Sequence, residues 1–116
     1  MITNAGLARV LALLDQDLEY FGLGVGTSPE ADSENLDQEA IRKIATATID
    51  GDTLIKEVYL DESQGNGIHF TSAGIFGDGA TNVIGTGKLF AGAEINVDKD
   101  QYESLTVSIE ITVETE

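Results

Sequence analysis

The chain has 116 residues, enough for one domain with a modest hydrophobic core and too short for two. Lys and Arg total 6 and Asp and Glu total 21, giving a formal net charge of −15 that argues against nucleic-acid binding and against docking on an anionic membrane. The absence of Cys excludes disulfides, thiolate metal sites and a Cys nucleophile, and no apolar run approaches the ~20 residues of a membrane-spanning helix.

The acidity also bears on the source of the protein. Hydrophobic residues make up 41% of the chain, so we expect it to fold and to carry its acids on the surface. Self-repulsion at this charge density destabilises a compact state at low ionic strength. At molar salt the Debye length falls to ~3 Å, which screens the repulsion. The composition therefore favours a halophilic source, with a calcium-laden extracellular protein as the competing interpretation.

Residues 3–15 are predicted to form the one clear helix. Thr3 or Asn4 can cap its N-terminus by accepting a backbone N–H bond. Asp15 and Asp17 oppose the helix dipole, so we expect the helix to end near them. A single apolar stripe at helical spacing supports the assignment: Leu7, Val10, Leu11, Leu14 and Leu18.

Most of the remaining chain is predicted to form strands separated by Gly-rich or acidic turns. Residues 36–48 are ambiguous between a helical turn and a strand. The alternation of apolar and polar residues over 105–113 is the cleanest strand pattern, typical of a half-buried antiparallel strand. The fold expected is α+β and mostly β: a single domain with its N-terminal helix packed on an antiparallel sheet or β-sandwich. The other predicted strands are 19–27, 53–60, 68–76 and 83–91.

None of the residue patterns that usually carry chemistry is complete. His69 is the only His, so it lacks the partners of a structural zinc site, and we interpret it as an ordinary strand residue. The Gly22–Thr27 segment lacks the third Gly of a dinucleotide fingerprint, and Gly87-Lys88 lacks the flanking residues of a P-loop. We therefore predict no catalytic, cofactor or metal site, and no enzyme activity.

Three closely spaced acidic pairs could in principle supply calcium ligands. None is followed by the Gly and the distal Glu of an EF-hand loop, and such pairs arise by chance in a chain this acidic. We interpret them as solvated surface acids. The pairs are Asp15 with Asp17, Asp50 with Asp52, and Asp98 with Asp100.

Short motifs occur in a fixed order along nearly the whole chain. They are Ile2-Thr3-Asn4-Ala5-Gly6-Leu7, Gly22-Leu23-Gly24-Val25-Gly26-Thr27, Leu36-Asp37-Gln38-Glu39 with Ile41-Arg42-Lys43, Ser72-Ala73-Gly74-Ile75-Phe76, Lys88-Leu89-Phe90-Ala91, and the strand from Leu105 to Thr112. The series resembles a family of small tail-associated structural proteins of tailed bacteriophages and archaeal viruses. This chain departs from the family in lacking an Arg after Ala91, in having Ile109 where an aromatic is common, and in its acidity.

The resemblance implies a virion structural protein of the tail tip, baseplate or fibre-attachment region. The protein would belong to a virus of a halophile and would be assembled into the virion in the host cytoplasm. We expect a homo-oligomer, a trimer or hexamer, that also docks other tail, baseplate or fibre proteins. No cofactor, nucleic acid or membrane insertion is implied. Phe76 has an alternative interpretation: it could be buried in the chain's own hydrophobic core and make no contact with another subunit. The candidate subunit contacts are Ala73, Gly74, Ile75, Phe76, Gly77, Val83 and Ile84.

Two other functions were weighed against this one. A capsid decoration or turret protein would share the composition and differ in copy number and position on the particle. A carbohydrate-binding module of a halophilic cell is less favoured, because such modules usually expose aromatic side chains and this chain has 4 Phe, 3 Tyr and no Trp.

Overall fold

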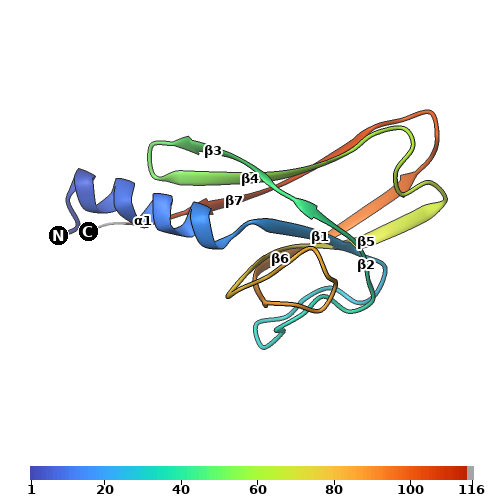
Figure 1. Cartoon of the computed structure of the whole chain (residues 1–116), viewed down its shortest axis with the longest axis horizontal. Helices are drawn as coiled ribbons and strands as arrows, with labels where there is room; N and C mark the ends of the chain where they lie inside the picture. The colour runs from blue at the N-terminus through green and yellow to red at the C-terminus, as the bar shows by residue number, and fades with distance from the viewer. Residues whose placement is uncertain (115–116) are drawn as a thin grey trace.

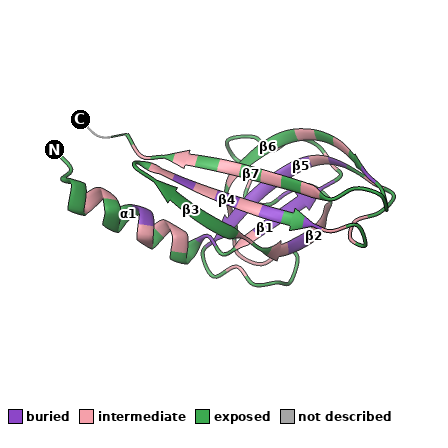
Figure 2. Cartoon of the chain, turned by 90° about the horizontal axis from the view of Figure 1, so that it is seen from above, coloured by how far each residue is buried: buried purple, intermediate pink, exposed green. Residues whose placement is uncertain are grey.

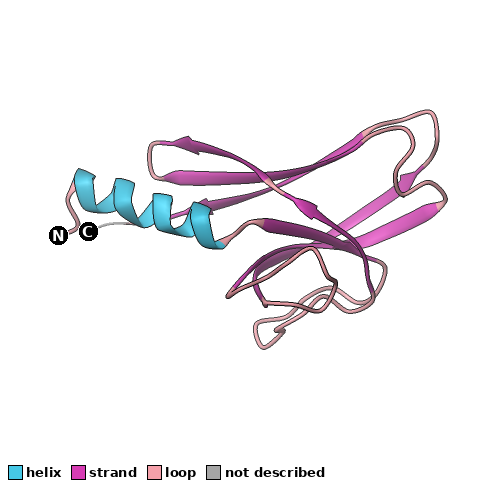
Figure 3. Cartoon of the chain, in the orientation of Figure 1, coloured by secondary structure: helices cyan, strands magenta, loops and turns pink. Residues whose placement is uncertain are grey.

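A computed structural model describes residues 1–114, in which one helix precedes seven strands (Figures 1 and 3). The α+β, mostly β fold expected from the sequence is confirmed. The elements are α1 (Asn4–Asp17), β1 (Tyr20–Gly24), β2 (Glu39–Ile44), β3 (Thr46–Asp50), β4 (Thr53–Leu60), β5 (Ile68–Gly77), β6 (Lys88–Lys99) and β7 (Leu105–Thr112).

The strands form two antiparallel sheets. One has four strands in the order β2-β1-β5-β6, and the other has three in the order β3-β4-β7. The ambiguous stretch 36–48 supplies no helix: β2 and β3 follow each other with only Ala45 between them, so the chain passes there from one sheet to the other. The molecule is elongated, 48 × 29 × 22 Å, with α1 and the β3–β4 turn at one end (Figure 1).

One hydrophobic cluster joins the helix and both sheets. Along β4 the buried side chains alternate with more exposed ones, as expected for a strand with one face on the core. Figure 2 shows burial concentrated on β1 and β5, while much of α1 is exposed. The buried members of the cluster are Leu11, Leu18, Phe21, Leu23, Leu54, Val58, Leu60, Phe70, Ala73 and Ile75.

The opposite face of the four-stranded sheet is covered by two loops, residues 25–38 and 78–87. A Cβ on Gly74 of β5 would lie 3.2 Å from the side chain of Leu36 in the first loop, and one on Gly92 of β6 would collide with Pro29 of the same loop. Glycine at these positions lets the covering side chains approach the sheet backbone. Both faces of β1 and β5 are therefore buried.

Several boundaries differ from the prediction: β1 ends at Gly24 rather than at 27, β5 and β7 differ by one residue at their ends, and the largest differences concern β6 and the helix. Residues 83–87 form a loop, and β6 runs from Lys88 to Lys99, because Gly85 and Gly87 adopt φ of 95° and 72°, outside the strand region. The helix continues to Asp17 rather than ending at 15, and Thr3 is its N-cap. The dipole penalty at its C-terminal end is offset, since Lys56 Nζ lies 2.5 Å from Asp15 Oδ1.

Candidate interaction surface

The structure separates the predicted contact residues into two groups. Val83 and Ile84 lie on the loop between β5 and β6, with 60% and 48% of their surfaces exposed. The other five lie on β5, which has a neighbour on each side, and all five are buried, so they are not accessible to a partner in this structure. The burial of Phe76 matches its alternative interpretation as a core residue. The buried group is Ala73, Gly74, Ile75, Phe76 and Gly77.

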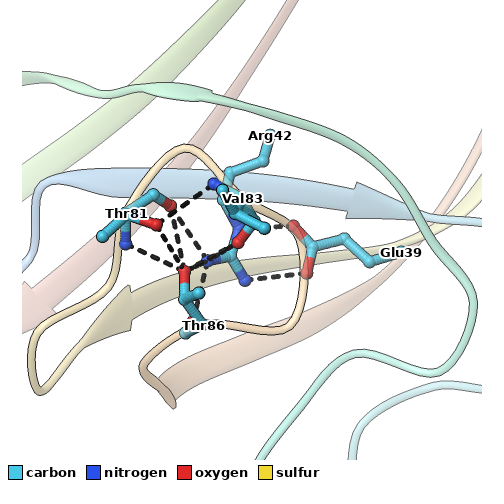
Figure 4. A network of polar contacts seen from close by, with 5 residues as sticks. All are labelled: Glu39, Arg42, Thr81, Val83 and Thr86. Atoms are coloured by element: carbon cyan, nitrogen blue, oxygen red, sulfur yellow. Dashed lines mark hydrogen bonds and ion pairs between the residues drawn. The ribbon is translucent and has the colours of Figure 1, made fainter.

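The loop that carries Val83 is fastened to the sheet by one buried cation (Figure 4). The side chain of Arg42 on β2 is 0% exposed. Its Nη1 donates to the carbonyl oxygens of Thr81, Val83 and Thr86 at 3.2, 3.2 and 2.8 Å. Its Nε and Nη2 donate to the two carboxylate oxygens of Glu39 at 2.7 and 2.8 Å. All three guanidinium nitrogens therefore have partners.

Phe76 completes the environment of this cation. The guanidinium carbon of Arg42 lies 4.0 Å from the centroid of the Phe76 ring, a cation–π contact. A planar guanidinium can pair with a carboxylate through one edge, donate to carbonyls through another and stack by its face, which a Lys ammonium cannot do. Phe76 thus supports the exposed loop from beneath without touching solvent.

Polar contacts within the loop hold its shape as well. The Thr81 N–H donates to the Thr86 hydroxyl oxygen at 2.9 Å, and that hydroxyl donates to the Val83 carbonyl at 2.6 Å. The short loop closes at Gly87, where a Cβ would collide with Ala80. Val83 and Ile84 are therefore presented by a preorganised loop, which lowers the entropy cost of binding.

His69 and members of the acidic pairs, interpreted above as an ordinary strand residue and as surface acids, have partners typical of structural roles. His69 Nδ1 lies 2.6 Å from Asp98 Oδ1 on the neighbouring strand, where 49% and 87% of the two side chains are exposed. Asp100 accepts from the Tyr102 N–H, and Asp17 accepts from the Asp78 N–H. Within residues 1–114, no three His, Cys, Asp or Glu residues are grouped so as to hold a metal ion.

Two further polar groups stand out. The Ser63 hydroxyl and backbone N–H donate to Asp61 at 2.6 and 2.8 Å, and these hydrogen bonds lower the pKa of the Asp61 carboxyl below its usual 3.8. The Ser72 hydroxyl is buried without a hydrogen-bond partner, next to the backbone of Gly24.

The role of Arg42 was not predictable from its local pattern, in which it is one residue of the motif Ile41-Arg42-Lys43. The available signal was weak: Arg42 stands three residues after Glu39 and directly before Lys43, in a strand of which half the residues are charged. The carbonyl oxygens that it binds are some 40 residues away along the chain and have no residue-type signature.

Among residues 1–114, no helix has the length and hydropathy needed to cross a membrane. No protein-family model matches the sequence, and no curated protein with significant similarity to it was found.

Proposed function

We propose that the chain is a structural subunit of a viral tail, at the tail tip, baseplate or fibre-attachment region of a virus of a halophile. It acts by assembling with its own copies and by docking other tail proteins. The ordered motifs described above support the viral assignment. The structural observation that carries the assembly role is the exposed apolar tip at Val83 and Ile84, which a buried Arg42 holds in place.

The surroundings of this tip suit a protein contact. Residues 79–93 contain no Asp or Glu in a chain that carries 21 acids. Val83, Ile84 and Phe90, which is 50% exposed, all lie in this acid-free stretch. A charged protein that keeps apolar side chains exposed and acids away from them has the local composition of an interface core.

Apolar burial is the suitable force for such a contact at high salt. Complete burial of a Val or Ile side chain is worth about 1.5–3 kcal/mol, so the exposed halves of Val83 and Ile84 supply about 1 kcal/mol each. Screening weakens charge attraction at high ionic strength, whereas apolar burial is retained. Small contacts of this kind become effective when they are repeated around a closed ring.

Labelled-antibody electron microscopy on purified particles in molar salt tests the tail role. Label clustered at the tail end supports it. Label spread over the head would indicate a capsid decoration protein, and particles without label would indicate a cellular protein. Either result overturns the tail role.

A paired variant tests the loop. Val83→Asp together with Ile84→Asp should prevent incorporation into particles, because two charges are then placed in the apolar contact. Tyr102→Asp, at a position that is 81% exposed outside the loop, is the matched control and should be incorporated normally. Normal incorporation of the double variant would refute the loop as a contact.

A further inference from the structure

The acids are distributed unevenly along the chain. The first 14 residues contain no Asp or Glu, and they carry Arg9 and the α-amino group, whereas all 21 acids follow. These residues form most of α1, at one end of the elongated molecule (Figure 1). The helix therefore carries no negative side chain from Asn4 to Leu14, and its two acids, Asp15 and Asp17, lie in its last turn.

This helix exposes apolar side chains that the core does not use. Leu11 is fully buried, while Val10 and Leu13 are 37% and 46% exposed, and Ile2, just before the helix, is 46% exposed. A helix that only covered its own core would turn polar residues outward. The outward apolar positions of α1 therefore lack a partner within residues 1–114.

The adjacent strand is also open to a partner. β3 forms one edge of its sheet, and all of its residues from Thr46 to Asp50 are exposed. Natural edge strands are usually protected by charged residues, Pro or bulges. β3 has no charge before its last residue, whereas β2, β6 and β7, the other edge strands, each carry charges within the strand.

The N-terminal half of the helix lies next to the β3–β4 turn. A groove of about 440 Å³ lies between α1 and the β3–β4 turn. Leu7, Ala8 and Ile49 supply its apolar part, and Ile49 itself is 47% exposed. We call the exposed side of α1 together with β3 the helix–edge surface.

We propose that the helix–edge surface joins two copies of this chain, with their β3 strands paired antiparallel across a two-fold axis. The charge distribution favours a second copy as the occupant. Two molecules of net charge −15 repel wherever their acids meet, so they approach most readily where acids are sparse, and on this surface the acids are confined to the helix end and the β3–β4 turn. A two-fold axis places the same surface on both sides, which satisfies this condition for both copies at once.

Charge complementarity adds to the case. Among the residues that the structure describes, Arg9 is the one of the 6 Lys and Arg residues without a hydrogen bond or ion pair. Asp52, in the β3–β4 turn, lines the groove, and Asp50 precedes it. Arg9 is therefore a cation that is available to an acidic group of a second copy.

The required area explains why both elements take part. A standard interface buries about 800 Å² on each partner, far more than a strand as short as β3 provides alone. The helix of 14 residues adds a face about 21 Å long. The pairing holds whether or not the chain belongs to a viral tail, because it uses residues other than the Val83 loop.

The absence of Cys permits a direct test. In an antiparallel pair, opposed Cα atoms lie about 4.5–5.5 Å apart, within the range of about 4.4–6.8 Å that a disulfide spans. Single Cys variants Thr46→Cys, Ala47→Cys and Thr48→Cys should therefore include one that gives a covalent dimer under mild oxidation in molar salt. Thr106→Cys and Ser108→Cys, on the opposite edge strand β7, are the matched controls and should stay monomeric in denaturing gels. No dimer from any β3 position, or equal cross-linking from β7, would overturn the pairing.

The oligomeric state gives a second readout. Sedimentation equilibrium of the unmodified chain in molar salt should show a dimer. Ile49→Lys should raise its dissociation constant about tenfold or more, equivalent to about 1.4 kcal/mol. Thr106→Lys should leave it unchanged, and circular dichroism should confirm that both variants fold. A monomeric chain, or an Ile49→Lys dimer of unchanged affinity, would refute the proposal. A dimer that never labels on particles would instead refute only the viral role.

Discussion

Replacing Arg42 with Met should destabilise the protein strongly, because Arg42 is the only cation that neutralises a buried carboxylate in the described residues. Its removal leaves Glu39, whose side chain is 3% exposed, without a counter-charge. It also leaves the carbonyls of Thr81, Val83 and Thr86 without that donor. Breaking a buried ion pair by deleting one partner costs about 3–5 kcal/mol, against a total stability of about 5–15 kcal/mol for a typical domain. At about 4 °C or more per kcal/mol, Tm should fall by at least about 12 °C.

Two further variants separate the origins of this cost. The double variant Arg42→Met with Glu39→Met should recover much of the loss, since no charge then stays buried. Arg42→Lys should fall between the two, because one ammonium cannot serve Glu39 and the loop carbonyls together. Urea unfolding followed by circular dichroism in molar salt measures all three, and hydrogen exchange of loop amides reports local release. A cost below about 1 kcal/mol for Arg42→Met, as for an exposed pair, would refute the reasoning.

Two other polar groups give predictions whose sign the structure fixes. The side chain of Lys56 is 3% exposed and that of its partner Asp15 is 39% exposed, so Asp15→Ala, which strands a buried ammonium, should cost about 3 kcal/mol. Lys56→Met strands only a half-exposed carboxylate and should cost about 1 kcal/mol or less in urea unfolding; equal costs would contradict this asymmetry. The pKa of Asp61 is lowered in the folded state, mainly by the Ser63 hydrogen bonds, so its contribution to stability is present above about pH 4 and is lost as the pH falls through the folded-state pKa. Ser63→Ala should raise that pKa in an NMR titration, and an unchanged value would show that the hydrogen bonds do not form in solution.

Elements with a strong local pattern were predictable from the sequence. The bounds of β4 agree with the predicted strand 53–60, because apolar residues alternate along it and a turn sequence precedes it. The closing strand and the helix were found for the same reason. In each case the periodicity of one element decides its type and its buried face.

The accessibility of the predicted contacts depended on parts of the chain far apart in sequence. Residues 73–77 contain apolar and small residues that suit either an interface or a core. They are buried because β1 and β6 flank β5 and because the loops 25–38 and 78–87 cover its outer face. The residue pattern of β5 carries no information about which strands flank it or which loops cover it. The position of Val83 on a loop was obscured likewise, since the β-branched pair at 83–84 favours a strand until Gly85 and Gly87 interrupt it.

The distribution of charge links the two proposed contact surfaces to ionic strength. Most of the large apolar side chains that remain exposed lie in three acid-free stretches, 1–14, 40–49 and 79–93. Around these stretches the 21 acids form a field that opposes the approach of any second copy in dilute salt. At molar salt the Debye length is only ~3 Å, so two copies do not repel each other until their surfaces are almost in contact. Apolar burial can then stabilise the contact without a long-range electrostatic penalty. Assembly through either surface should therefore require high salt even under conditions where the isolated chain is already folded.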